Sequence, residues 1–169
     1  MVRIALTGET RKALVPCLQQ DARLYREKVG LYAGVPLGWA YAAAGDRLAK
    51  TPPGSLCAAN QPWIVNLLAR RPAVIAPRFR DAAQLRRYLA RYRPATLTLF
   101  VRYPHLAQPE PEDVTTAGRL VENLWTQPKL RPELTDVLEL DAADVRATRA
   151  SREALLMFRV RPRGRYHGR

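Results

Sequence analysis

The sequence predicts an α/β fold: a three-layer, Rossmann-like domain whose mostly parallel sheet has an antiparallel edge and follows a helical N-terminal segment. Two patterns predict this fold. Between residues 37 and 101, short apolar runs bounded by turn residues alternate with segments whose apolar residues recur at helical spacing. Nearer the C-terminus, two apolar runs are separated by one short polar connection, which favours an antiparallel pair at the sheet edge.

The first helix ends at residues 51–54, Thr-Pro-Pro-Gly, because proline cannot continue a helix. The apolar positions that predict this helix are Leu37, Ala40, Tyr41, Ala44 and Leu48. Residues 55–59 then form a short apolar run that is typical of a buried strand. Asn60 caps a second helix over residues 61–69, whose first turn tolerates Pro62 because no N–H is needed there.

A second strand and helix follow, and then a third strand. Residues 73–76 are a short apolar run that ends at a proline. Asp81 and Gln84 have the spacing of a capping box and open a helix that ends at Pro94. Residues 95–101 are rich in Thr, Leu, Phe and Val, which favour strands. The short connections between these elements imply parallel strands joined by right-handed crossovers.

The residue pattern in the last third of the chain predicts one more helix and two strands. After a proline-punctuated loop at 103–111, a helix begins at Glu112 and carries apolar residues at helical spacing, namely Val114, Ala117, Val121, Leu124 and Trp125. Residues 134–140 and 154–160 have the composition of strands, and residues 141–151 form the polar connection between them.

Composition divides the chain into a helical N-terminal segment at 1–50, an α/β domain at 51–160 and a basic disordered tail at 161–169. The 169 residues are 47% hydrophobic and 25% charged, which is typical of a globular domain with a core. The net charge is +13, and residues 57–108 alone carry +8. This charge favours an anionic partner: a lipid headgroup, a sugar-phosphate lipid or a nucleic acid.

Arginines form the largest group of candidate binding residues. Because a guanidinium binds phosphate through two parallel donors, they predict an anion-binding surface. The candidates are Arg70, Arg71, Arg78, Arg80, Arg86, Arg87, Arg91 and Arg93. A second interpretation needs no ligand: the 24 Arg against 4 Lys indicate a bias toward GC-rich codons, and an amphipathic helix needs a charged solvent face.

Catalytic and metal-binding motifs are absent from the sequence. Neither Ser55 nor Ser151 lies in a G-x-S-x-G motif, and no glycine-rich phosphate loop is present. Cys57 lies in a predicted buried strand, where a thiol acts as a small apolar side chain. The two Cys, at 17 and 57, and two His are too few and too scattered for a closed zinc site. We expect no catalytic residue, no metal and no cofactor.

Two weaker candidates lie after the third predicted strand. His105 follows the carboxyl end of that strand, where α/β proteins tend to place ligands. Glu110, Glu112 and Asp113 form the densest carboxylate cluster, which suits either a hard cation or, more simply, the positive end of a helix dipole.

The N-terminal residues become charged before any apolar run forms, so we expect no secretory signal peptide and, for the chain as written, a cytoplasmic location. Residues 29–45 are uncharged but too short for a membrane span. They predict a packed helix or, because of Tyr32, Trp39 and Tyr41, a segment at a membrane interface. The spacing of the two thiols favours free cysteines without excluding a pair.

An ordered series of short motifs covers about two thirds of the chain. It comprises Leu48-Ala49-Lys50, Thr51-Pro52-Pro53-Gly54-Ser55, Asn60-Gln61-Pro62-Trp63, Arg70-Arg71-Pro72-Ala73-Val74, the helix and strand over residues 85–101, and Leu155-Leu156-Met157-Phe158-Arg159-Val160. With these motifs the chain resembles the extracytoplasmic C-terminal domain of membrane glycosyltransferases of the protein mannosyltransferase type, which use lipid-linked sugar donors.

The resemblance implies a noncatalytic soluble domain, because that family carries its catalytic carboxylate in a loop between transmembrane helices that this sequence does not contain. Two alternative functions do not depend on the resemblance. One is a basic nucleic-acid-binding module, whose affinity falls steeply with salt. The other is peripheral membrane attachment through residues 29–45 and the basic tail.

Overall fold

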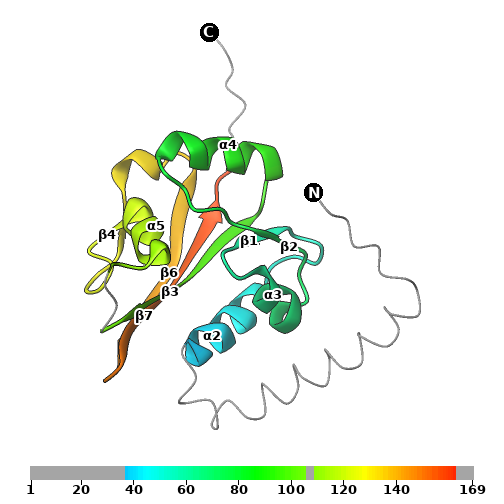
Figure 1. The fold of residues 1–169 in the computed structure, drawn as a ribbon. Coiled ribbons are helices and arrows are strands. Elements are labelled where there is room, and N and C mark those ends of the chain that lie inside the picture. The colour runs from blue at the N-terminus through cyan, green and yellow to red at the C-terminus, as the bar shows by residue number, and fades with distance from the viewer. Residues whose placement is uncertain (1–36, 106–108, 163–169) are drawn as a thin grey trace.

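The computed structural model describes residues 37–105 and 109–162, which form a mixed five-stranded sheet with helices packed on it (Figure 1). The strands lie in the order β2 (Ala73–Ile75), β1 (Cys57–Ala59), β3 (Thr96–Pro104), β7 (Ser151–Val160) and β6 (Leu138–Ala147). β1 pairs in parallel with β2 and β3, whereas β7 runs antiparallel to both β3 and β6. The predicted α/β class, the parallel strands and the antiparallel edge are confirmed.

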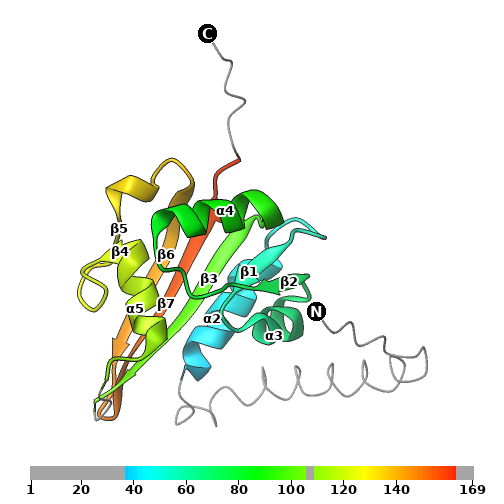
Figure 2. The ribbon, with the colours of Figure 1, turned by 45° about the horizontal axis from the view of Figure 1, so that its top comes forward.

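Two helical connections join the parallel strands. α3 (Pro62–Ile64) and the π-helical turn Val65–Ala69 connect β1 to β2, and α4 (Ala82–Tyr92) connects β2 to β3. The chain moves outward from β1 to β2 and then returns past β1 to β3. The β1–β2 and β2–β3 connections therefore run in opposite directions across the sheet. If both are right-handed, their helices must lie on opposite faces. α3 and α4 do lie on opposite faces (Figure 2).

Each face of the sheet has its own hydrophobic core. α4 and α5 (Glu112–Leu120) pack on one face, with Phe79, Leu97 and Phe158 buried beneath them. α2 (Gly38–Ala49) and α3 pack on the other face, where Phe100 and Leu155 are buried. These side chains alternate along β3 and β7 because successive strand residues point to opposite faces.

α2 packs very closely against the π-helical turn. A Cβ atom on Gly45 would lie 2.9 Å from the Cβ of Leu68, so only glycine allows this approach. The C-terminal end of α2 is held by Arg71, whose guanidinium donates to the carbonyl oxygens of Ala49 at 2.8 Å and Thr51 at 2.6 Å. These carbonyls have no partner within the helix, so Arg71 supplies the C-terminal cap.

The helix predicted from Glu112 ends earlier than expected. α5 stops at Leu120, and Val121–Glu122 forms a short strand, β4, that pairs with β5 (Lys129–Leu130). Val121 is extended and Asn123 has a φ of 54°, so the chain turns where helical spacing predicted another turn of helix. Leu124 still reaches the core from this hairpin, which explains why its position followed the helical pattern.

The predicted boundaries of the last two strands are also wrong. β6 begins at Leu138 and runs to Ala147, and Leu134 instead lies in a 3₁₀ turn that starts at Pro132. Most of the expected polar connection at 141–151 is therefore strand, and β7 starts at Ser151. The charged residues of β6 led to the incorrect prediction of a loop. Their side chains lie outside the core, and such residues occur in edge strands as well as in loops.

The predicted helix before residue 51 is confirmed as α2, with Trp39 and Tyr41 packed against its core cluster. Residues 1–36, with Cys17 and Tyr32, and the tail from residue 163 lie outside the described residues. Among the helices that the structure describes, none has the length and apolar character needed to cross a membrane.

Candidate anion-binding groove

The eight predicted arginines do not form one surface. Three of them have protein partners: Arg71 caps α2, Arg78 pairs with Glu112, and Arg86 contacts both carboxylate oxygens of Asp136, with its Nη2 2.9 Å from the Oδ1. The guanidinium of Arg86 lowers the pKa of Asp136 by hydrogen bonding, and the same hydrogen bond raises the pKa of Arg86. The guanidinium groups of these three residues are therefore occupied by contacts within the domain.

The other predicted arginines are exposed. They are Arg70, Arg80, Arg87, Arg91 and Arg93. Among the described residues, none of their guanidinium groups makes a hydrogen bond or an ion pair, although Arg91 lies over the ring of Tyr92 at 5.3 Å. Their charges are therefore available to a ligand.

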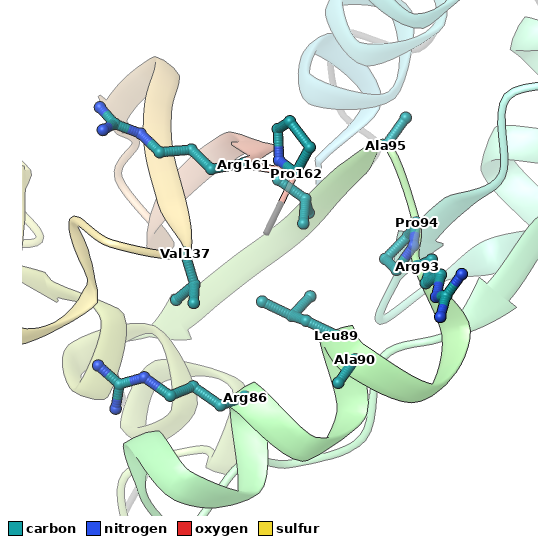
Figure 3. Close-up of a pocket in the computed structure, with 10 residues that line it drawn as sticks. Arg86, Leu89, Ala90, Arg93, Pro94, Ala95, Val137, Arg161 and Pro162 are labelled. Atoms are coloured by element: carbon teal, nitrogen blue, oxygen red, sulfur yellow. The ribbon is translucent and has the colours of Figure 1, made fainter. Parts of the chain in front are cut away.

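One flank of α4 forms the wall of an open groove of about 740 Å³ (Figure 3). Arg86, Leu89, Ala90 and Arg93 lie on this flank, because residues three and four apart in a helix share a side. The other walls come from the start of β3 and from the ends of β6 and β7, namely Pro94, Ala95, Val137, Val160, Arg161 and Pro162. Arg87 and Arg91 are absent from this lining and belong to other sides of α4.

Arg161 is the residue of this groove that sequence reasoning missed. It was assigned to a disordered tail, but its backbone N–H donates to the carbonyl of Val137 at 2.9 Å. The preceding residue, Val160, donates in the same way to Ala95 at 3.0 Å. These bonds fix Arg161 across the groove from α4. The sequence could have indicated this placement, because Arg161 directly follows Val160, the last apolar residue of the predicted strand.

The groove combines cationic and apolar chemistry. Arg86 is neutralised by Asp136, whereas the side chains of Arg93 and Arg161 have no partner within the described part of the chain. Between these cations the walls are aliphatic or proline side chains. The residues that line the groove include no carboxylate, thiol, hydroxyl or imidazole, so their side chains offer binding without an acid, a base or a nucleophile.

The opposite end of the sheet carries a charge network that sequence reasoning also missed. Glu153, only 4% exposed, accepts hydrogen bonds from the Nε1–H of Trp39 at 2.7 Å and from the hydroxyl of Ser151 at 3.1 Å. Its other neighbours are Arg102, 3.8 Å away, and Arg146, which is directly opposite it on β6 and stacks on Trp39 at 4.4 Å. Strand periodicity could have found Glu153, because it shares a face with Leu155.

None of the remaining candidates lines the groove. His105 is exposed, and its Nε2 lies 3.0 Å from the carbonyl oxygen of Thr148 on the β6–β7 turn. Cys57 is a free, buried thiol whose pKa is raised by burial, as expected for a small apolar side chain. Of the carboxylates near the start of α5, Glu112 pairs with Arg78. No group of three metal-ligating side chains exists among the residues with described positions.

Comparison with known proteins adds no relative: no family model, no curated protein and no solved structure matches this chain. The resemblance to mannosyltransferase-type domains therefore stays a prediction.

Proposed function

We propose that this domain binds a phosphate-bearing amphiphile, of the sugar-phosphate lipid class, in the groove beside α4 and does not transform it. The observation that carries the proposal is the placement of Arg93 and Arg161, which have no partner among the described residues, on opposite walls of an apolar groove.

The two free cations supply the site for a phosphate. Guanidinium groups bind phosphate through charge-assisted hydrogen bonds, which are stronger than neutral ones. The backbone of Arg93 is fixed by its N–H, which donates to the carbonyl of Leu89 at 2.9 Å. The backbone of Arg161 is fixed by Val137. In Figure 3 the two guanidinium groups extend in opposite directions from the groove, so both side chains have to turn toward an anion bound between them. Because the backbone of each residue is already fixed, the entropy cost of binding is confined to ordering these two side chains.

The aliphatic walls supply the site for an apolar chain. A bare phosphate or a nucleic-acid backbone would gain little from Val137, Val160 and Pro162, whereas a lipid chain would bury apolar area against these partly exposed side chains. The groove has the volume of a small-molecule site. These features favour an amphiphile over a purely ionic ligand.

This function agrees with the kinship proposed from the sequence. A domain related to the C-terminal part of a lipid-linked-sugar glycosyltransferase would meet a phosphate next to an apolar chain. It would hold such a ligand without the catalytic carboxylate of the membrane part. The Rossmann-like assignment belongs to the same proposal, and the support for it is the crossover pattern of β1, β2 and β3.

A second candidate function rests on a different surface. Arg87 and Arg91 lie outside the groove, and Arg91 stacks on the partly exposed ring of Tyr92. Cations beside an exposed aromatic ring suit single-stranded nucleic acid, whose bases stack on such rings. This alternative predicts RNA binding that depends on Arg87 and Arg91 and weakens steeply with salt.

The test compares an amphiphile that has both a phosphate and an apolar chain with ligands that have only one of these two parts. We expect the full chain to bind dodecyl phosphate in isothermal titration calorimetry, and to bind dodecyl maltoside and inorganic phosphate much more weakly. The double variant Arg93→Ala/Arg161→Ala should lose roughly tenfold or more in affinity for dodecyl phosphate. The matched control Arg87→Ala/Arg91→Ala removes the same charge outside the groove and should bind normally.

Two outcomes would overturn the proposal. One is equal loss in both double variants, which would indicate a general charge effect. The other is tight, salt-sensitive binding of single-stranded RNA that the control variant abolishes, which would favour the nucleic-acid function.

A further inference from the structure

The two edges of the sheet are protected very differently. β2, at one edge, is three residues long and lies between Pro72 and Pro77. β6, at the other edge, has ten residues and pairs on one side only, with β7. A long edge strand exposes a row of backbone donors and acceptors, which is a template for pairing with another strand.

The hairpin turn shows which backbone groups of β6 are open. Thr148 donates its N–H to the carbonyl of Ser151 at 2.8 Å. Because bonds in an antiparallel pair alternate, Arg146, Asp144 and Ala142 then bond toward β7. The N–H and C=O groups of Ala143, Val145 and Ala147 point away from the sheet. Among the described residues, no partner bonds to these outward groups.

Space for a strand lies along this part of the edge. An open cavity of about 570 Å³ borders Ala143 to Arg146. Trp39 and Arg47 of α2 line it on one face of the sheet, and Thr126 and Pro128 line it on the other. A cavity bordered from both faces of a sheet follows the edge itself, where an added strand would lie.

The charges on β6 identify a second copy of the chain as the occupant. Asp144 and Arg146 are two residues apart and therefore share a face, where Asp144 pairs with Arg47 at 2.6 Å and Arg146 stacks on Trp39. Antiparallel pairing centred on Val145 would place each Asp144 opposite Arg146 of the other copy. A two-fold axis forms this pair twice, so the edge is self-complementary.

The same register also satisfies the backbone. With Val145 at the centre, Val145 faces its own copy and Ala143 faces Ala147, and these are the residues with open groups. Each such pair exchanges two hydrogen bonds, which gives about six between the copies. The bulge between Leu140 and Ala142 and the turn after Ala147 limit the pairing to this stretch.

We infer that this chain forms a two-fold dimer in which the β6 strands pair antiparallel about Val145 and join the two sheets into one. Asp144 and Arg146 select this register through their charges, and the open backbone groups provide the main attraction. The dimer interface lies apart from the groove beside α4, so the inference does not depend on the proposed ligand.

Sedimentation velocity on the full chain, with dilution from roughly 100 μM, tests the dimer, because weak interfaces dissociate in that range. We expect a mass that rises toward twice 19.1 kDa with concentration. Val145→Pro removes an outward N–H without touching a bond to β7, and should weaken the dimer by roughly tenfold or more. Arg146→Asp should weaken it to a similar extent, and Asp144→Arg/Arg146→Asp should restore it.

Two controls separate this edge from other surfaces. Trp63 and Ile75 are the most exposed large apolar side chains in the described residues, so Trp63→Ser/Ile75→Lys removes the main competing apolar contact. This variant should dimerise normally. Hydrogen exchange gives a readout that needs no variant: the amides of Ala143, Val145 and Ala147 should become protected as the concentration rises.

The inference is overturned by a monomer throughout the concentration range, by a dimer that survives Val145→Pro, or by a dimer that Trp63→Ser/Ile75→Lys abolishes. Unchanged exchange at Val145 across the dimerisation range would contradict it equally.

Discussion

Arginines occur at both ends of the sheet, but the two ends hold them differently. At the β6–β7 turn, the buried carboxylate of Glu153 accepts a hydrogen bond from Trp39 and lies 3.8 Å from Arg102, and Arg146 stacks on the ring of Trp39. At the opposite end, Arg93 and Arg161 line an apolar groove and have no protein partner among the described residues. At the first end the arginines contact side chains of the domain itself, whereas at the second end their guanidinium groups are open to a ligand.

The difference shows why the number of arginines alone did not define a site. A guanidinium with a carboxylate or carbonyl partner stabilises the fold, as Arg71 and Arg86 do. Only a guanidinium without such a partner offers its donors to a ligand.

Glu153→Ala should cause the largest loss of stability. Removing the carboxylate leaves the Nε1–H of Trp39 without its acceptor and Arg102 without its opposite charge, and Ser151 keeps only its contact with Thr148. Breaking a buried charge network typically costs about 3 kcal/mol. Urea denaturation measures this loss, and Glu139→Ala, at an exposed position of β6, should change the free energy of unfolding by less than about 0.5 kcal/mol. Equal effects in the two variants would show that the network has no special role.

Gly45→Ala tests the close packing of α2, the helix that carries Trp39 to Glu153. The added Cβ would lie 2.9 Å from the Cβ of Leu68, and this overpacking should cost about 2 kcal/mol. Gly118→Ala is a matched control in α5, because a Cβ there meets no atom within 4 Å. It should stabilise the protein by up to about 1 kcal/mol through helix propensity. Thermal unfolding of both variants should show shifts of opposite sign, and a stabilised Gly45→Ala variant would contradict the packing.

Arg71→Ala and Arg70→Ala compare adjacent arginines with different surroundings. Arg71 holds the carbonyls that end α2, so its removal should cost about 1–2 kcal/mol. Arg70 is exposed and has no partner in the described part of the chain, so its removal should change stability by less than about 0.5 kcal/mol. Chemical denaturation of the pair separates the two classes of arginine, and equal costs would remove the distinction.

At neutral pH Tyr88→Phe should have the smallest effect, because it removes only the hydrogen bond from the hydroxyl to the carbonyl of Ile75. Burial raises the pKa of Tyr88 to about 12 from an ordinary value of 10.0. The folded state therefore favours the protonated phenol: this stabilisation is complete below pH 10.0 and is lost as the pH rises toward about 12. Tyr88→Phe should flatten the dependence of the unfolding free energy on pH in that window. An unchanged slope would show that Tyr88 does not titrate there.

Much of the parallel half of the fold was predictable, because its signals are local. Pro52 and Pro53 end a helix and Asp81 caps one through its bond to the N–H of Gln84 at 2.7 Å, so neighbouring residues fix these boundaries. The antiparallel half was less predictable, because β6 is defined by its partner. Its residues carry charges typical of a loop, and only pairing with the buried strand β7 makes them a strand.

The sequence predicted that the candidate site would bind an anion, but it did not predict which arginines would form the site. Charge indicated an anion-binding surface and included Arg86 and Arg93 among its members. The sequence contained no sign that Asp136 would neutralise Arg86, because fifty positions separate them. Arg161 resembled the rest of a basic tail, and only its bond to Val137 distinguishes it. Long-range contacts therefore decide which arginines remain available.

The most direct test of the account is a two-dimensional amide NMR titration of the full chain with dodecyl phosphate. The account predicts shifts concentrated at Leu89, Ala90, Arg93, Val137 and Arg161, with little change at Trp39, Arg146 and Glu153. Shifts centred on the β6–β7 end, or an even response of all exposed arginines, would contradict it.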